Sequence, residues 1–314
     1  MSVSKPTHLA IRRAAAALLH DRLVAFPTET VYGLGARARS SRAVLRLYAA
    51  KGRPRFNPLI AHVADLAHAR RLVRFDERAE RLAHRFWPGP LTLVLPRLAG
   101  AAVSRLAGAG LSTLGVRIPD HPVALALLRR IGEPVVAPSA NPSGRLSPTR
   151  AGDVARTLGG RVAWILDGGA CRVGLESTIV DLSGPRARLL RPGGIAREAI
   201  EALIGPLAGA GNEIRAPGML ESHYAPRARL RLDAASAAAG EAYLGYGPLP
   251  ALPDDVPALT LSAARDPQEA ARNLFAFLQT LDRPHIRTIA VAPVPPDGIG
   301  LAIRDRLARA AAPR

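Results

Sequence analysis

Short apolar runs that end at proline or glycine alternate with helical patterns from residue 1 to residue 205. Residues 23–26 are a typical run, because the apolar side chains stop at Pro27, as expected of a buried strand. Similar runs cover 59–63, 91–95, 115–118, 135–137, 162–166, 177–182 and 189–190. Helical patterns lie between them at 8–23, 40–50, 65–73, 76–86 and 121–131. This alternation predicts an α/β domain built on an open, twisted mixed sheet.

The composition changes between residues 206 and 228, where Gly, Ala, Pro and polar residues replace the apolar periodicity. Such a composition is typical of a linker. From 229 to 314 a shorter α/β pattern returns, with strands near 241–246 and 286–292 and helices at 267–281 and from 298. We therefore expect an N-terminal domain (1–205), a linker (206–228) and a smaller, Rossmann-like C-terminal α/β domain (229–314).

The composition fits a cytoplasmic protein rather than a membrane protein. Hydrophobic residues make up 48% of the 314 residues, enough for a sizeable core. No apolar stretch approaches the roughly 20 residues that span a bilayer, and the first residues lack a signal-peptide core. The lone Cys171 excludes an internal disulfide and a metal site built from cysteines.

The formal net charge of +18 raises the question of nucleic-acid binding. The arginines are spread along the chain and form no single basic run, which predicts a weak general attraction to RNA and not a dedicated RNA-binding face. Lysine occurs only at Lys5 and Lys51. Because nearly every other cation is arginine, a lysine at position 51 either marks a site that needs a compact ammonium group or occurs there by chance.

The common nucleotide-binding and hydrolase motifs are absent from the sequence, namely G-x-x-x-x-G-K-[ST], G-x-G-x-x-G, H-E-x-x-H and G-x-S-x-G. Polar loops at strand ends are the remaining place for chemistry in an open α/β sheet. Four such loops stand out, at 27–35, 51–59, 139–149 and 176–178. In the second, Lys51 and Arg53 put two cations on a proline-stiffened turn suited to phosphates.

Each loop also has a purely structural interpretation. Residues 28–30 could be a helix-capping turn, 51–55 a solvated loop, and 139–144 an ordinary turn. Within the first loop, residues 33–35 are expected to form a flexible glycine turn. Either Ser40 or Ser41 could cap the helix that follows. His62 on an apolar strand is more often a packed histidine than a catalytic one. The four loops together favour a binding site.

At these loops the sequence resembles the YrdC-like threonylcarbamoyl-AMP synthases, in the long form with an extra C-terminal domain. The matching segments occur in the family's order and cover most of residues 20–226. They are FPTETVYGLG (26–35), KGRPRFNPLIAHV (51–63), WPGPLTLVL (87–95), VRIPDHP (116–122), APSANPSG (137–144), SPT (147–149), ESTIVD (176–181), LRPG (190–193) and HYAP (223–226).

The resemblance implies a reaction in which L-threonine, bicarbonate or CO2, and ATP give threonylcarbamoyl-AMP and pyrophosphate. It further implies a Mg²⁺ ion that enters with ATP and a downstream tRNA threonylcarbamoyl-transferase machinery, which modifies an adenosine next to the anticodon. An enzyme of the nucleotidyltransferase type is therefore expected. The lid expected over its site is the linker, because Tyr224 lies there.

The resemblance also assigns site residues. Lys51 and Arg53 would be catalytic. The residues expected to contact ATP are Arg53, Asn57, Thr113, the backbone at Ala137, Ser147, Arg191 and Tyr224. Those expected to hold L-threonine are Thr30, His62, Arg117, Ser139 and Ser177, with Arg117 on its carboxylate. One departure is Phe56, which stands where the family typically has Asp.

Two other functions stay open at this point. A carbamoyltransferase could use a related YrdC-like domain to make carbamoyl-adenylate, although such proteins carry metal-binding modules that this chain lacks. A non-catalytic RNA-binding protein is favoured only by charge, and the sequence offers neither an aromatic platform nor a clustered basic stripe.

Overall fold

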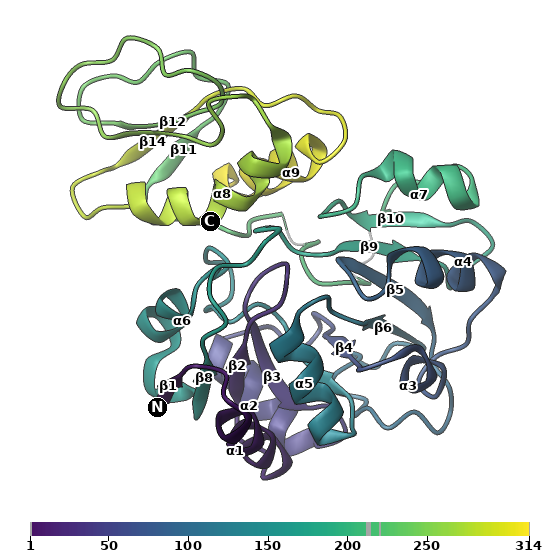
Figure 1. The fold of residues 1–314 in the computed structure, drawn as a ribbon. Helices are drawn as coiled ribbons and strands as arrows, with labels where there is room; N and C mark the ends of the chain where they lie inside the picture. Colours follow the sequence, from purple (N-terminus) through teal and green to yellow (C-terminus); the bar gives the residue numbers. More distant parts are fainter. Residues whose placement is uncertain (1, 212–214, 220, 314) are drawn as a thin grey trace.

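The computed structural model describes residues 2–211, 215–219 and 221–313, and within them the strands form one large and one small sheet (Figure 1). The large sheet has ten strands in the order β1-β8-β2-β3-β7-β4-β6-β5-β9-β10. Parallel and antiparallel neighbours both occur, so the expected mixed sheet is confirmed. Its strands are β1 Ser2–Ser4, β2 Val24–Phe26, β3 Gly33–Arg37, β4 Ile60–His62, β5 Leu91–Pro96, β6 Thr113–Arg117, β7 Val135–Val136, β8 Trp164–Leu166, β9 Thr178–Asp181 and β10 Arg188–Arg191.

Helices cover both faces of this sheet because its strands are apolar on both sides. The N-terminal domain contains α1 His8–Leu19, α2 Ser41–Lys51, α3 Leu66–Arg70, α4 Glu77–Phe86, α5 Pro122–Ile131, α6 Ala151–Leu158 and α7 Arg197–Ile204. On one face α1 and α5 pack over Val24 and Phe26. On the other face the remaining helices pack over alternate residues such as Ala25 and Val136.

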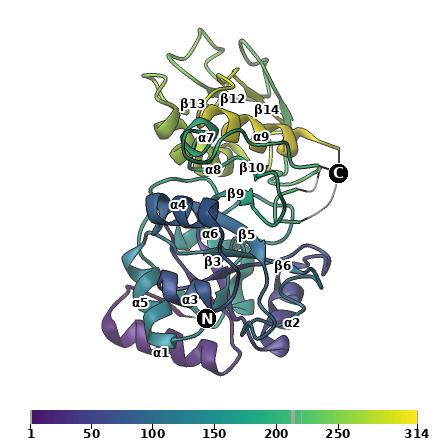
Figure 2. The same ribbon diagram turned by 90° about the vertical axis from the view of Figure 1, so that its right-hand side faces the viewer.

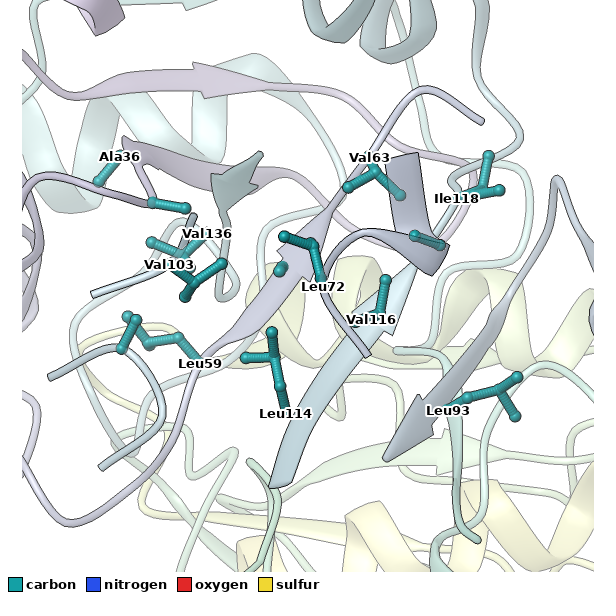
Figure 3. Packing of buried hydrophobic residues seen from close by; sticks show 14 of the residues in the cluster. Ala36, Leu59, Val63, Leu72, Leu93, Val103, Leu114, Val116, Ile118 and Val136 are labelled. Carbon is teal, nitrogen blue, oxygen red and sulfur yellow. The ribbon is translucent and has the colours of Figure 1, made fainter. Parts of the chain in front are cut away.

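Figure 3 shows part of the second core, to which Leu72, Val116 and Val136 all belong. The alternation of side chains along each strand places neighbours in different cores. Ala61 belongs to this core, whereas Ile60 faces the opposite side of the sheet.

The half of the sheet that holds β4, β5, β9 and β10 is covered on this opposite side by the linker. Ile60, Val94, Ile179 and Leu190 form a small apolar cluster there, with Ala216 of the linker packed against it. The polar loops at the strand ends lie beside this cluster, so the fold brings the linker over the same region as the expected site.

The C-terminal domain is a four-stranded parallel sheet with two long helices; the sequence predicts both helices and the strands β12 and β14, and the structure adds β11 and β13. Its elements are β11 Arg229–Arg231, β12 Ala242–Gly245, β13 Ala258–Thr260, α8 Pro267–Leu281, β14 Thr288–Val291 and α9 Gly300–Ala311, with the strand order β11-β14-β12-β13. In Figures 1 and 2, α8 and α9 lie between this sheet and the larger domain.

Several local predictions have clear outcomes. The helix expected at 267–281 is α8, and Ser40 caps α2 by accepting a hydrogen bond from the backbone amide of Ala43. The flexible turn expected at 33–35 is wrong, because these residues begin strand β3. Its glycines serve close packing: a Cβ on Gly35 would lie 2.9 Å from the Phe26 ring. No helix in the described ranges is long and apolar enough to cross a membrane.

Gly174 marks where the N-terminal domain meets α8. Its φ is +76°, and a Cβ built on it would lie 2.5 Å from Cα of Arg272 on α8. Backbone atoms cannot move aside as a flexible side chain can, so the close contact of the two domains requires glycine at this position.

We expect Gly174→Ala to lower the free energy of unfolding by about 2–4 kcal/mol, because it adds about 1–3 kcal/mol of overpacking to about 1 kcal/mol of left-handed backbone strain. Gly132→Ala is the matched control, with φ +67° and nothing within 4 Å of its added Cβ, and should show the backbone cost alone. Denaturant unfolding measures both variants. Equal losses would contradict the tight packing of Gly174 on α8.

Candidate functional site

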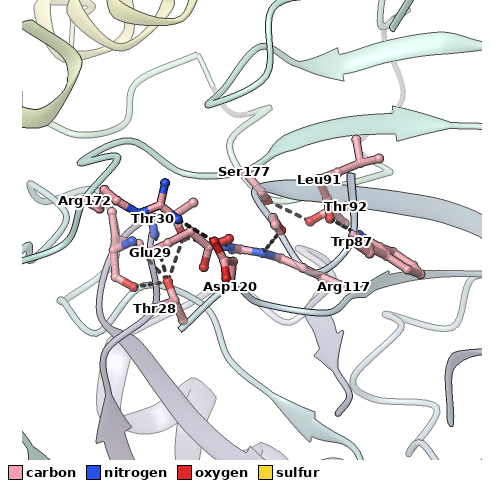
Figure 4. Close-up of polar contacts among 12 residues, drawn as sticks. Thr28, Glu29, Thr30, Trp87, Leu91, Thr92, Arg117, Asp120, Arg172 and Ser177 are labelled. Carbon is pink, nitrogen blue, oxygen red and sulfur yellow. Dashed lines mark hydrogen bonds and ion pairs between the residues drawn. The ribbon is translucent and has the colours of Figure 1, made fainter. Parts of the chain in front are cut away.

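The turn between β2 and β3 presents Thr30 to Arg117 (Figure 4). The hydroxyl of Thr28 donates to the carbonyl of Val31 at 2.7 Å and accepts from the backbone amides of Thr30 and Val31. These bonds fix a turn between two strands and not a helix cap. Arg117, at the end of β6, donates to the Thr30 hydroxyl at 2.9 Å. The hydroxyl of Thr28 therefore holds the turn in shape, and the turn directs the hydroxyl of Thr30 toward the guanidinium of Arg117.

Arg117 is buried and paired with Glu29, the two charged groups lying 2.6 Å apart. Its Nε donates to the carbonyl of Gly89 at 3.2 Å. These contacts hold the guanidinium plane while leaving N–H groups on Nη1 and Nη2 for a carboxylate. Glu29 thus acts as the residue that orients Arg117.

His62 is a neutral group at the end of β4. Burial and the positive charge of Arg117 lower the pKa of His62 to about 3. Its Nδ1 lies 3.2 Å from the carbonyl of Ile60, so in the neutral ring Nδ1 carries the proton and donates. The other ring nitrogen, Nε2, is then an acceptor for an amine or hydroxyl of a ligand.

Lys51 is the last residue of α2, which ends at Gly52 with φ +59°. Its ammonium group donates to the carbonyls of Ser139 and Asn141, so it ties α2 to the 139–144 loop. Burial, and next the charge of Arg53, hold the pKa of Lys51 well below its ordinary value.

Arg53 is held by the loop that follows. It donates to Oδ1 of Asn57 at 2.6 Å and to the carbonyl of Pro58 at 2.9 Å. Burial lowers the pKa of Arg53 to about 10. Nδ2 of Asn57 is buried without a hydrogen-bond partner among the described residues, which leaves one donor for a ligand.

Ser177, immediately before β9, lies next to Arg191 at the end of β10. Arg191 donates to the carbonyl of Ser177 at 2.9 Å and to its hydroxyl at 3.2 Å, and the Ser177 hydroxyl also lies 2.8 Å from that of Thr92 (Figure 4). The remaining nitrogen of Arg191 donates to the carbonyl of Pro217 in the linker at 3.2 Å. The linker is therefore bonded directly to the site.

Tyr224 in the linker is buried, and its backbone has φ +62°, which is unusual for a bulky residue. Its ring packs on Phe275 of α8 at 5.7 Å and on His223 at 4.1 Å, and the guanidinium of Arg306 of α9 lies 5.1 Å from it. Such strain persists only where the surroundings hold it. Here those surroundings belong mainly to the C-terminal domain.

Most of these residues line one narrow cavity of about 50 Å³. Of the site residues predicted from the sequence, those lining it are Thr30, Arg53, His62, Arg117, Ala137, Ser139, Ser177, Arg191 and Tyr224. Lys51, Asn57 and Ser147 support it from behind, through Ser139, Arg53 and Glu176 respectively. Thr113 lines an adjacent cavity, which shares Ile60 and Pro217 with the first.

Four further residues belong to this region and were not predicted as site members: Glu29, Glu176, His223 and Arg306. The first three lie inside the segments that match the family, each next to a residue assigned to the site. Their polar side chains beside those residues were the signal that could have identified them. Arg306 has no such signal, because it comes from α9. Phe56 points away, with 58% of its surface exposed, and does not line the cavity.

The cavity has an excess of positive charge. Lys51, Arg53 and Arg191 are all buried, and each is bonded to carbonyl, amide or hydroxyl oxygens. None of the three forms an ion pair with a carboxylate in the described part of the chain. Buried charges without partners are costly, so this arrangement is suited to a polyanion.

Glu176 is the carboxylate that lines the cavity, and both of its oxygens are engaged. One accepts from the Ser147 hydroxyl, and the other pairs with Arg306 at 2.8 Å. Burial raises its pKa, but Arg306 and Arg191 outweigh this and lower it overall. Among the described residues, no group of three or more His, Cys, Asp or Glu side chains is placed to hold a metal ion.

The fold and the cavity define a two-domain α/β protein with a narrow cavity lined by buried arginines. Two family models match the chain: one described as "Telomere recombination" over residues 16–193, and one described as "Threonylcarbamoyl-AMP synthase, C-terminal domain" over residues 195–312. The chain belongs to the threonylcarbamoyl-AMP synthase family.

Named relatives agree with this family over nearly the whole chain. Threonylcarbamoyl-AMP synthase of Bacillus subtilis is 43% identical over 324 residues, covering 97% of this chain and 93% of the relative. The Pyrococcus abyssi enzyme is 42% identical, covering 96% and 93%. The crystal structure of P. abyssi Sua5 complexed with L-threonine superposes with a TM-score of 0.89 at 40% identity, covering 98% of this chain and 96% of that one. The predicted family, fold class and enzyme activity are confirmed.

The two buried histidines make stability depend on pH. Burial lowers the pKa of both His62 and His223 to about 3, below the ordinary 6.5. Below about pH 6.5 the unfolded chain therefore binds protons that the folded chain does not, so stability falls as pH falls.

Between pH 7 and pH 5 we expect each of these histidines to account for about 2 kcal/mol of lost stability. His62→Gln and His223→Gln should each flatten the dependence of the unfolding free energy on pH over that range, and the double variant should flatten it further. Urea unfolding at a series of pH values measures the slope. A slope identical to that of the unaltered chain would show that the histidines titrate normally.

Proposed function

We propose that this chain condenses L-threonine, bicarbonate or CO2, and ATP into threonylcarbamoyl-AMP and pyrophosphate, with the cavity described above as its active site. The observation that carries the assignment of the site is a set of three buried cations, Lys51, Arg53 and Arg191, which form no ion pair with a carboxylate of the described residues. A triphosphate would supply the negative charge that these groups lack.

L-threonine occupies the half of the cavity near Arg117 in this proposal. The guanidinium binds the amino acid's carboxylate, because Glu29 and Gly89 already fix its plane. His62 accepts a hydrogen bond at Nε2, and Thr30, Ser139 and Ser177 supply further polar groups around the ligand. A threonine that is held by its carboxylate leaves its amine free to take up CO2.

ATP occupies the other half, where Lys51, Arg53 and Arg191 surround its phosphates. Asn57 would donate its free Nδ2, and Ser147, Thr113 and the backbone at Ala137 would contact the nucleotide. Tyr224 closes over it as part of the linker, whose Pro217 carbonyl already binds Arg191. These roles account for the burial of the three cations.

The chemistry then needs positioning more than proton transfer. The neutral threonine amine adds to CO2 and loses one proton to solvent, and an oxygen of the resulting carbamate attacks the α-phosphate of ATP while pyrophosphate leaves. Lys51 and Arg53 stabilise the charge that develops on the phosphates, in a site from which the linker excludes water. Nothing in this scheme requires a covalent intermediate with the protein.

We propose that Mg²⁺ enters with ATP and is held mainly by phosphate oxygens. Hard oxygen ligands suit this ion. Both oxygens of Glu176, the carboxylate among the described lining residues, are already bonded to Ser147 and Arg306. The ion would balance part of the triphosphate charge in the reaction.

We further propose that the adenylate passes in the cytoplasm to a tRNA threonylcarbamoyl-transferase machinery, which modifies an adenosine next to the anticodon. The net charge of +18 supports a weak general attraction of the chain to RNA.

The function is tested by pyrophosphate release from the purified chain with ATP, Mg²⁺ and bicarbonate, comparing L-threonine with serine and glycine. We expect release that depends on threonine and a nucleotide product with the mass of threonylcarbamoyl-AMP. Turnover with carbamoyl phosphate in place of threonine would point to a carbamoyltransferase instead. Binding of ATP without any turnover would contradict the proposal.

Arg117→Lys should raise the KM for threonine by about 100-fold, because a lysine keeps the charge but loses bidentate binding, worth about 2–3 kcal/mol. The affinity for ATP should change little. Arg172→Lys is the matched control, since Arg172 pairs with Asp120 at the surface nearby. An unchanged KM in Arg117→Lys would exclude the carboxylate clamp.

Lys51→Met should lower kcat by about 100- to 1000-fold, the range for removal of one preorganised electrostatic contact. The melting temperature of the ligand-free protein should change little, because removal of a buried charge without an ion-pair partner offsets the loss of its hydrogen bonds to the carbonyls of Ser139 and Asn141. Arg55→Ala, on the exposed side of the same loop, is the control. If both variants keep full activity, Lys51 has no part in catalysis.

A further inference from the structure

The core of the C-terminal domain is completed by side chains from the N-terminal domain. Val31, Leu146 and Leu175 are buried in the same apolar cluster as Leu274 and Phe275 of α8. Each of these three residues is the chain neighbour of a cavity or support residue: Val31 follows Thr30, Leu146 precedes Ser147, and Leu175 precedes Glu176. The C-terminal domain therefore holds three separate site loops by their apolar residues.

Arg306 of α9 extends the contact between the two domains to the polar residues around the cavity. It is 1% exposed, although it is an arginine on a helix of the other domain. Its Nε pairs with Glu176 at 2.8 Å, and its Nη2 donates to the carbonyl of Pro192 at 3.0 Å. Pro192 follows Arg191 in the chain. A single side chain of the C-terminal domain thus touches two loops of the N-terminal domain.

Two further contacts connect Arg306 with the nucleotide half of the cavity. The Glu176 oxygen that does not bind Arg306 accepts from the Ser147 hydroxyl. The guanidinium of Arg306 also lies 5.1 Å from the centre of the Tyr224 ring, within the range of a cation–π contact. Asp305, on the same helix, binds Nη1 at 2.6 Å and fixes the plane of the guanidinium.

We propose that Arg306 is a positioning residue for ATP: it anchors Glu176, Pro192 and Tyr224 at once, so that Ser147, Arg191 and Tyr224 reach their places only when the C-terminal domain is docked. Arg306 does not line the cavity itself and acts through these residues. This inference rests on the proposed function, which assigns these residues to ATP.

The physical reason is the burial of Glu176. A buried carboxylate is tolerated when it is paired and hydrogen-bonded, and an unpaired one rearranges or takes up a proton. Without Arg306, Glu176 would lose its ion-pair partner and no longer hold Ser147 in place. The C-terminal domain is then a required part of the nucleotide site and more than an attachment for the linker.

The test compares Arg306→Met and Arg306→Lys with Arg304→Ala in the full chain. Arg304 is an exposed arginine on the same helix and serves as the control. We expect Arg306→Met to weaken ATP binding by about 10- to 100-fold, the range typical of residues that hold ligand-binding groups in place. Arg306→Lys should lie between it and the unaltered chain. The KM for threonine should change less than the affinity for ATP, because Arg117 is held by Glu29 and Gly89.

A second readout is the pH dependence of ATP turnover, because loss of Arg306 should raise the pH at which Glu176 takes up a proton. The groups that act on Glu176 from its surroundings are Arg306, Arg191, Lys51, His223, Tyr224 and Ser147. In Arg306→Met the acid limb of kcat/KM for ATP should move to higher pH. The double variant Glu176→Gln/Arg306→Met should lack this movement, and it removes both buried charges in case the single variant folds poorly.

ATP affinity is measured by calorimetry and folding by circular dichroism on the same samples. The inference is overturned if Arg306→Met binds ATP as Arg304→Ala does, or if its constants for ATP and threonine weaken equally, in step with the fraction folded. Calorimetry separates this outcome from failure of the proposed function. If the unaltered chain binds ATP but releases no pyrophosphate with threonine, the reaction is wrong, while the comparison of ATP affinities still decides the role of Arg306.

Discussion

The buried carboxylate of Glu176 is the point on which the two domains and the cavity converge. It lies between Ser147 of one loop and Arg306 of the C-terminal domain, with Arg191 close enough to lower its pKa. A charge in this position can be kept only if each neighbour stays in place. The linker, the 174–177 loop and α9 are therefore parts of one arrangement, which Gly174 makes possible by letting α8 approach the loop backbone.

The rest of the cavity has the opposite charge balance. Lys51, Arg53 and Arg191 are held by carbonyl oxygens, which orient cations without neutralising them. The ligand-free protein thus keeps a strained electrostatic state that an incoming polyanion relieves. The unpaired cations lower the stability of the folded protein, and the apolar cores on both faces of the sheet compensate for this loss.

Much of the site was predictable because its residues lie in short polar loops directly after strands. Thr30 lies in such a loop and His62 ends the strand after another, whereas Ser177 precedes β9 and Arg117 ends β6, so that these two were assigned by the family resemblance alone. The glycines at 33 and 35 misled the prediction, because glycine serves both turns and close packing, and the partner Phe26 cannot be read from local sequence. Arg306 was not predictable, because no local pattern distinguishes it from the other arginines of a chain with a net charge of +18.

The sequence by itself determined the α/β class, the linker, the four site loops and the family. These depend on periodicity, on proline and glycine punctuation and on motif order, all of which are local along the chain. The tertiary structure alone decided which buried cations of the described residues lack a carboxylate partner. It also decided that residues 33–35 lie in a strand and that Arg306 of α9 pairs with Glu176. Those facts depend on contacts between segments far apart in the chain, up to 130 residues for this ion pair, and the free energy of such contacts comes from burial that no local pattern encodes.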